Sequence, residues 1–296
     1  MSGMEVGVVS VVLIVFLIYA GLYIPVALGL ISFLGVWILR GNIDMPVSLL
    51  SQAVSDAISD QVFATIPLFA MMGLLVGKAG LGRDIYDVAN VVFRKVLGGL
   101  GIATVAANAV FAAITGSSIA SASVFTKISV PEMRRYNYTA RFAVGVVAGS
   151  SVLGMLIPPS AMLIIYAIVT EQSVGHMFMA GIIPGLLLTA AYIGLILMIA
   201  KFWPTFIGGN ALHKSLGAAA TDPAQAQTMR GLEMIRRMLP IALLVFVVLG
   251  GIYGGVFTPV EAGAAGSLVA LFIALYRKML NFKGLWDVVV ETGHIT

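Results

Sequence analysis

Two polar stretches inside otherwise apolar sequence hold the residues best suited to chemistry. The first, "TGSSIASAS", covers residues 115–123 and lies within a run, 99–126, that contains no charged residue. The second, "GMLIPPS", covers residues 154–160 and lies within another uncharged run, 142–170. Hydroxyl oxygens, and backbone carbonyls released by proline, are ligands for a hard monovalent cation. The two stretches therefore predict an oxygen-rich ion site if the fold brings them together.

The composition indicates where such a site would lie. Hydrophobic residues make up 60% of the 296 residues and charged residues only 10%, whereas a soluble domain has about 25% charged residues. We therefore expect an all-α polytopic protein in a lipid bilayer, because helices satisfy their own backbone groups there. The chain has no cysteine, which excludes disulfides and thiolate metal sites. Nothing in the composition calls for a nucleic-acid partner.

Apolar runs of about 20 residues, each long enough for one membrane crossing, recur along the chain. They predict spans near residues 6–22, 24–40, 61–77, 142–170, 177–200, 238–254 and 259–276. The segment 41–60 has acidic residues and no Lys or Arg, whereas 78–95 has four basic residues. Because basic loops stay on the cytoplasmic side, the first of these faces out and the second faces in. The N-terminus is accordingly expected on the periplasmic side.

The uncharged run 99–126 is expected to enter the membrane without crossing it. Basic residues flank it on both sides, including Lys95 and Lys127, so both of its ends should be cytoplasmic. Two arms of roughly 20 Å each are too short to cross a core of about 30 Å twice. We therefore predict a re-entrant hairpin that turns near Gly116.

The run 142–170 is predicted to be a broken helix. Pro158 and Pro159 follow Gly154 closely, and proline removes a backbone donor and disrupts the preceding turn. Lipid cannot satisfy the released carbonyls, so such a break is tolerated where it lines a cavity or binds a ligand. The alternative is that both features serve packing, since small residues let membrane helices approach closely and serines bond to their own helix.

The sequence also repeats itself. "IYAGLYIPVALG" (18–29) and "IYGGVFTPVEAG" (252–263) match at six of twelve positions without a gap, and the charge pattern gives their spans opposite directions. This predicts an inverted repeat, which is common in secondary transporters. The second unit is incomplete, so we expect a longer protein of roughly 430 residues with a second hairpin tip near ~350, and we expect residues 1–296 not to transport alone.

The expected organisation follows from these features. We predict scaffold helices and an interfacial helix in 1–60, a first transport unit in 61–176, a connecting span with a cytoplasmic loop in 177–237, and the start of the second repeat in 238–296. The interfacial helix is the amphipathic stretch "MPVSLLSQAVSDAISD", whose pattern is typical of a helix lying along a membrane surface.

Five motifs together resemble the large membrane (permease) subunit of the tripartite ATP-independent periplasmic (TRAP) transporters. They are "IPLFAMMG", "TGSSIASAS", "GMLIPPSAMLIIYAIVT", "MFMAGIIPGLL" and "GGVFTPVEAGAAG". The resemblance implies an inverted-repeat, elevator-type importer in the bacterial inner membrane. It implies sodium-coupled uptake of small organic acid anions such as C4-dicarboxylates or sialic acid. It also implies a small four-helix membrane subunit and a periplasmic substrate-binding protein as partners, and no cofactor besides the coupling ion.

The resemblance also assigns residues. The family's first sodium site, built from the hairpin tip and the broken helix, maps here to Thr115, Gly116, Ser117 and the backbone of Gly154, Ile157 and Pro159. For the substrate, Ser118 and Ser160 are candidates from position alone.

Three other functions can be compared with transport. Glu261 could couple protons, but "TPVE" is also a helix start in which Thr258 and Glu261 form a capping box. An intramembrane serine hydrolase needs a base beside its serine, yet the three histidines lie in loops or near the terminus. A structural subunit without an ion site is the alternative only if the hairpin and the break serve packing. We therefore expect a transporter subunit and not an enzyme.

Overall fold

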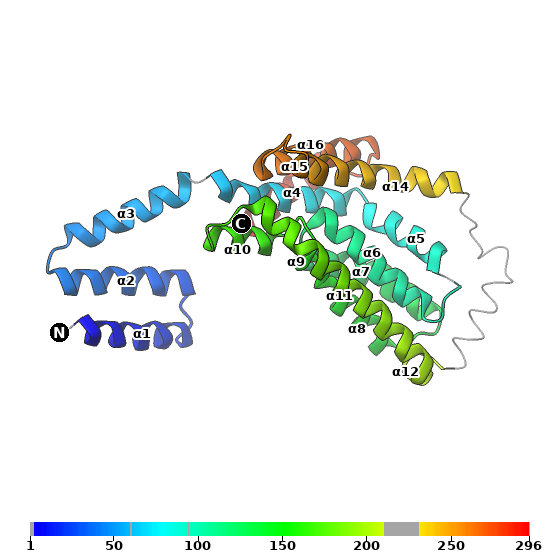
Figure 1. Ribbon diagram of the computed structural model, residues 1–296, viewed down its shortest axis with the longest axis horizontal. Coiled ribbons are helices and arrows are strands. Elements are labelled where there is room, and N and C mark those ends of the chain that lie inside the picture. Colours follow the sequence, from blue (N-terminus) through cyan, green and yellow to red (C-terminus); the bar gives the residue numbers. More distant parts are fainter. Residues whose placement is uncertain (1–2, 60, 94, 210–230, 296) are drawn as a thin grey trace. The chain divides into compact units, whose positions relative to one another are not determined.

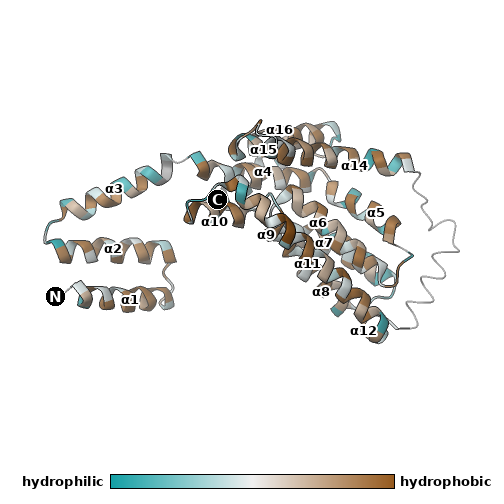
Figure 2. Cartoon of the chain, viewed as in Figure 1, coloured by the Kyte–Doolittle hydropathy of each residue, from teal (hydrophilic) through white to brown (hydrophobic). Residues whose placement is uncertain are grey.

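The computed structural model describes residues 3–59, 61–93, 95–209 and 231–295, and none of them lies in a β-strand. The expected all-α architecture is confirmed. Among the described residues, four helices and one bent helix pair are long and apolar enough to cross a membrane. Apolar residues run along α11 and α16 (Figure 2). The chain divides into two compact units, Met1–Phe63 and Ala64–Thr296, which are described separately.

The described part of the first unit contains three α-helices and most of the 3-10 helix η1 (Gln61–Ala64) (Figure 1). The α-helices are α1 (Gly3–Tyr19), α2 (Ile24–Arg40) and α3 (Asp44–Ser59). The first two pack side by side as an apolar hairpin. α2 stops at Gly41, whose φ of 64° is a left-handed C-cap conformation that glycine adopts without strain. Apolar and polar residues alternate along α3 (Figure 2), which agrees with the amphipathic pattern expected there.

The second unit begins with helices that lead into the predicted hairpin. In order they are α4 (Thr65–Lys78), α5 (Leu81–Phe93), α6 (Gly99–Thr115) and α7 (Ser118–Arg135). The hairpin α6–α7 turns where the sequence predicted, at Gly116. Its second arm, however, does not end at residue 126, because the helix continues through Lys127 to Arg135. Charged side chains do not stop a helix, so the arms are about 26 Å long and not about 20 Å.

The broken helix follows. It consists of α8 (Ala140–Ser151), α9 (Leu153–Leu156) and α10 (Ala161–Val169), and the chain bends by 41° between α9 and α10. The break lies at the two prolines, as predicted. The long span α11 (Val174–Phe202) comes next and ends in the short α12 (Pro204–Ile207). The cytoplasmic loop predicted after the connecting span, within 177–237, therefore contains helix at Pro204–Ile207 and from Gly231, and residues 210–230 lie outside the described residues.

The last helices return to α4 and α5. They are α14 (Gly231–Val245), the π-helical turn η2 (Phe246–Gly250), α15 (Gly251–Tyr253), α16 (Pro259–Tyr276) and α17 (Phe282–Ile295). α16 packs along α4 through a face of small buried residues, an arrangement that lets membrane helices approach closely. The Ser267 hydroxyl donates to the Leu68 carbonyl across this contact at 2.7 Å.

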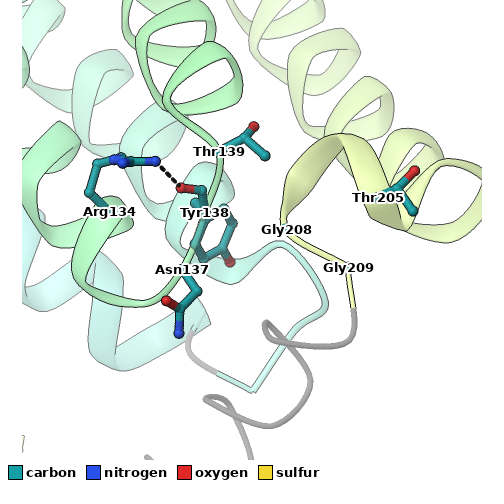
Figure 3. A pocket seen from close by; sticks show the side chains of 7 residues that line it. All are labelled: Arg134, Asn137, Tyr138, Thr139, Thr205, Gly208 and Gly209. Atoms are coloured by element: carbon teal, nitrogen blue, oxygen red, sulfur yellow. Dashed lines mark hydrogen bonds between the residues drawn. The ribbon is translucent and has the colours of Figure 1, made fainter.

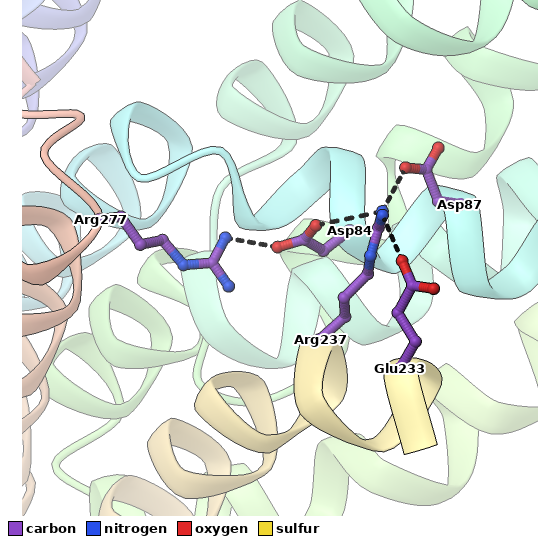
Figure 4. A network of polar contacts seen from close by, with 5 residues as sticks. All are labelled: Asp84, Asp87, Glu233, Arg237 and Arg277. Atoms are coloured by element: carbon purple, nitrogen blue, oxygen red, sulfur yellow. Dashed lines mark hydrogen bonds and ion pairs between the residues drawn. The ribbon is translucent and has the colours of Figure 1, made fainter. Parts of the chain in front are cut away.

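Carboxylates on α5 fasten it to α14 and α16 (Figure 4). Asp84 forms ion pairs with both Arg277 and Arg237. Arg237 also reaches Asp87 at 2.8 Å and Glu233 at 2.9 Å. Asp84 is therefore shared by an arginine of α14 and the arginine that ends α16, both far away in the sequence.

The internal repeat is visible in backbone hydrogen bonds. In the turn after α1, Ala20 N donates to Phe16 O, Gly21 N to Ile18 O and Leu22 N to Leu17 O. The three bonds recur 234 positions later, from Gly254 N to Gly250 O, Gly255 N to Ile252 O and Val256 N to Gly251 O. Gly21 and Gly255 both have positive φ, 95° and 70°. The sequence match thus encodes the same helix-ending turn twice.

Candidate functional site

The hairpin tip is built from three residues with different backbone conformations. Thr115 is the last residue of α6, and Gly116 adopts φ 58°, ψ 16° while its N–H bonds to the Ala112 carbonyl at 3.0 Å. Ser117 is extended and caps α7, because its hydroxyl oxygen accepts from Ala120 N at 3.3 Å. A left-handed glycine followed by a serine cap is what reverses the chain in two residues.

The break between α9 and α10 leaves carbonyls without their helical donors. Because prolines 158 and 159 lack an N–H, the carbonyls of Gly154 and Met155 cannot form their usual bonds to residues four positions ahead. The Ser160 hydroxyl donates to the Met155 carbonyl at 2.6 Å and so replaces one of these bonds. The Gly154 carbonyl gains no such replacement from its own helix.

The tip and the break interlock. The Ala161 amide donates to the Gly116 carbonyl at 3.3 Å. A Cβ atom on Gly116 would lie only 3.0 Å from the Pro159 carbonyl carbon, and one on Gly154 would lie 2.7 Å from the Ser117 carbonyl carbon. Both glycines are therefore needed for this close approach. The structure brings together most of the residues that the sequence nominated.

The buried hydroxyls at this junction keep their lone pairs. Thr115 is 2% exposed and donates its hydroxyl hydrogen to the Phe111 carbonyl at 3.0 Å. Ser160 is fully buried and donates its hydrogen to Met155, as described above. A hydroxyl has one hydrogen and two acceptor positions. Each oxygen can therefore still coordinate a cation.

Four helix ends meet at the junction. α6 and α9 end there, with Thr115 and Leu156, and α7 and α10 begin there, with Ser118 and Ala161. Helix C-termini favour cations, and helix N-termini favour anions. The geometry thus suits a cation and an anion bound next to each other.

The side chains of two residues predicted for the site, Ile157 and Ser118, are not enclosed between the hairpin tip and the helix break. Ile157 is extended at the end of α9 and lies against α11, since a Cβ atom on Gly185 would be 2.7 Å from its Cγ1. Ser118 is only half-buried, in the first turn of α7.

Sequence reasoning missed the glycines that let other helices close around the junction. A Cβ atom on Gly73 of α4 would lie 2.9 Å from the Thr115 carbonyl oxygen, and one on Gly181 of α11 would lie 2.8 Å from the Leu156 carbonyl oxygen. Gly181 and Gly185 are four residues apart within an apolar span. This spacing is typical of close helix packing, so it could have identified α11 as a closely packed helix, although not the segment that it contacts.

The capping interpretation of Glu261 is confirmed. Its carboxylate accepts from the Thr258 amide at 2.8 Å, while the Thr258 hydroxyl oxygen accepts from the Glu261 amide at 3.3 Å. Both halves of the capping box are present.

Comparison with known proteins decides what kind of protein carries this junction. Residues 11–296 match the family model of the tripartite ATP-independent periplasmic transporter, DctM component. The chain belongs to this family. DctM proteins are transporter components and not enzymes, and the resemblance drawn from the five motifs is confirmed.

Several curated DctM relatives are similar over most of this chain. The C4-dicarboxylate TRAP transporter large permease protein DctM of Pseudomonas aeruginosa is 37% identical over 233 residues, covering 78% of this chain and 51% of the relative. The protein of the same name in Vibrio cholerae is 33% identical over 290 residues, covering 95% of the chain and 60% of the relative. The sialic acid TRAP transporter large permease protein SiaM of Vibrio cholerae is 29% identical, covering 95% and 62%. The chain thus spans between half and two thirds of the length of these relatives.

Proposed function

We propose that the junction of the hairpin tip and the helix break is a sodium site in a secondary transporter that imports small organic acid anions. The observation that carries this proposal is the meeting of four helix ends, with buried hydroxyls and a released carbonyl, where the tip and the break interlock. Membership of the DctM family supports the transport role.

In this proposal, oxygen atoms of the tip and the break surround the cation. Thr115 and Ser117 contribute hydroxyls, and Gly116 forms the turn between them. The backbone carbonyls of Gly154, Ile157 and Pro159 complete the set. Since the Gly154 carbonyl has lost its helical donor, sodium compensates for a bond that proline prevents.

The anion would bind beside the cation, at the first turns of α7 and α10. Ser118 and Ser160 stand at these two helix starts, where backbone N–H groups attract a carboxylate. Sodium would hold the tip against the break and thereby fix both helix starts. Each ligand then raises the affinity for the other by the same factor, as thermodynamic linkage requires.

Relatives suggest which anions the complete transporter carries. Those described above are named for C4-dicarboxylate and sialic acid, so we propose a small organic acid of this kind. A small four-helix membrane subunit and a periplasmic binding protein would be the partners, in the inner membrane with the N-terminus periplasmic. Transport would follow an elevator motion of the unit that holds the junction.

Two matched threonine variants test the sodium site. Thr115→Val keeps the shape of the side chain and removes the hydroxyl at the tip. Thr104→Val removes an equally buried hydroxyl on the same helix, which donates to the Leu100 carbonyl at 2.8 Å, about three turns from the tip. Both variants should cost similar stability, so a difference in transport reports on the site.

The assay is sodium-driven uptake of succinate and of sialic acid by the complete transporter with its partners in liposomes. Removing even a residue that only hydrogen-bonds to a metal ligand lowers metal affinity about 10-fold or more. We therefore expect Thr115→Val to raise the sodium concentration for half-maximal uptake by at least this factor, and Thr104→Val to leave it unchanged. Equal sodium dependence in the two variants would exclude Thr115 as a ligand, and uptake without sodium would exclude sodium coupling.

A further inference from the structure

A polar cleft lies away from the tip and the break, where the turn between α7 and α8 meets α12 (Figure 3). Its volume is about 380 Å³. It is lined by Arg134, Asn137, Tyr138, Thr139, Thr205, Gly208 and Gly209. The proposed transport function uses none of these residues.

Hydrogen bonds fix the walls of the cleft. The Thr139 hydroxyl donates to the Phe206 carbonyl at 2.6 Å, and the Thr139 amide donates to the Ile207 carbonyl at 2.7 Å. On the other wall, the Arg134 guanidinium donates through Nη1 to the Tyr138 carbonyl at 3.3 Å (Figure 3). The guanidinium is therefore oriented by one N–H, and its remaining donors are available to a ligand.

The cleft is positively charged. Its lining includes Arg134 and no carboxylate, and Arg135, Arg141 and Lys201 lie close to it along the chain. Within the described part of the chain, none of these four cations forms an ion pair with a carboxylate. Arg237 and Arg277, in contrast, are paired with acidic residues (Figure 4). A ligand of the cleft is thus expected to be an anion.

The surroundings of the cleft are typical of a membrane surface. The 29-residue span α11 ends at Phe202, and Phe202 and Trp203 are 64% and 60% exposed. Lys201 Nζ lies 5.7 Å from the centre of the Phe202 ring. Exposed aromatic and basic residues at the end of a span mark the level of the lipid head groups, and an excess of Lys and Arg marks the cytoplasmic side.

We propose that this cleft binds the phosphate of an anionic phospholipid from the cytoplasmic leaflet. Arg134 supplies the charge, and the Thr205 hydroxyl and the Asn137 amide supply further polar contacts to the head group. Basic pockets between membrane helices on this side commonly hold such lipids. The lipid would then bridge the turn between α7 and α8 and the segment that follows α11, two parts of the protein that the Thr139 hydrogen bonds already join.

The test uses the chain in nanodiscs made of equal parts phosphatidylglycerol and phosphatidylcholine. Native mass spectrometry of the protein released from them gives the ratio of the two lipids that remain bound. We expect the wild type to retain phosphatidylglycerol preferentially. Loss of the direct contact between Arg134 and the lipid phosphate should change lipid affinity about fivefold, so Arg134→Gln should lower the ratio by about this factor.

Two further variants make the result specific. Arg236→Gln removes an exposed arginine of α14 that forms no ion pair among the described residues, and it should leave the ratio unchanged. Thr205→Phe should block the cleft while keeping the Arg134 bond to Tyr138, so it should lower the ratio even if Arg134→Gln fails to fold. Equal losses in Arg134→Gln and Arg236→Gln, or no preference in the wild type, would overturn the proposal.

Inorganic phosphate distinguishes a lipid from a soluble ligand. If the cleft holds a lipid, millimolar phosphate added to protein in phosphatidylcholine alone should not reproduce the thermal stabilisation given by phosphatidylglycerol. Stabilisation by phosphate that equals that by the lipid, and that is lost in Thr205→Phe, would assign the cleft to a soluble phosphate and overturn the lipid proposal.

Discussion

Replacing Gly116 with alanine should separate the hairpin tip from the helix break. Two features of Gly116 oppose a side chain: its φ of 58° lies in the left-handed region, and its Cβ would meet the backbone of Pro159 and Ser160 at 3.0 and 3.2 Å. These atoms belong to the backbone and cannot rotate away. Relief therefore requires the tip to move away from the break.

The magnitude follows from the two contributions. A left-handed alanine costs about 1 kcal/mol, and overpacking a close contact costs about 1–3 kcal/mol. Gly255 has a φ of 70° but open space around its Cβ position, so Gly255→Ala carries only the first cost. The difference between the variants, about 1–3 kcal/mol, measures the contact alone. If the site binds sodium only when the tip is packed against the break, this difference of about 1–3 kcal/mol weakens the apparent sodium affinity roughly 5-fold to 150-fold.

The assay compares thermal unfolding of both variants in detergent, with and without sodium. Gly116→Ala should melt several degrees below Gly255→Ala and should gain little stability from sodium at concentrations that stabilise Gly255→Ala. If the two variants have equal melting temperatures and equal sodium responses, the tip does not press against the break, and the site as described is wrong.

Three further predictions concern the helices around the site. Asp84→Asn removes a carboxylate shared by two arginines and should lower the melting temperature clearly more than Lys78→Gln, which breaks a single 3.8 Å pair whose side chains are 43% and 51% exposed. Thr258→Ala removes the α16 cap and should cost about 1 kcal/mol of unfolding free energy in denaturant titrations, whereas Thr258→Ser should restore the wild-type value. Burial raises the pKa of the Asp87 carboxyl above its ordinary value of 3.8, although Arg237 beside it lowers that pKa. The folded state therefore holds the proton of Asp87 more tightly than the unfolded state does. The contribution of Asp87 to stability falls as pH rises from 3.8 through the raised pKa. Asp87→Asn should remove that part of the pH dependence of the melting temperature, and an unchanged pH profile would contradict the assignment.

The main elements of this fold could be predicted because their signals are local. Apolar runs mark the long helices, two prolines give the break, and Gly116 followed by Ser117 gives the turn, since each acts within a few residues. Two of the predicted spans, 6–22 and 24–40, form apolar helices of 17 residues, α1 and α2, which are shorter than the four long spans. The capping box of α16 was readable for the same reason. The end of the second hairpin arm could not be predicted in this way, because basic residues mark where the chain leaves the membrane and not where a helix ends.

The contacts that assemble the site could not be predicted, because they join segments far apart in the sequence. Nothing next to Gly73 indicates that it faces Thr115, and nothing next to Ile157 indicates that it packs on Gly185. Likewise, Asp84 could be recognised as charged but not as the partner of Arg277. Such contacts depend on how the helices pack, which a single sequence constrains only weakly.

The most direct test of the central claim is equilibrium binding of radioactive sodium to the purified protein, compared between wild type, Thr115→Val and Thr104→Val. The proposed site predicts saturable binding in the wild type that potassium does not displace, an affinity at least about 10-fold lower in Thr115→Val, and wild-type affinity in Thr104→Val. No saturable binding, or equal affinities in the two variants, would contradict a sodium site at the meeting of the hairpin tip and the helix break.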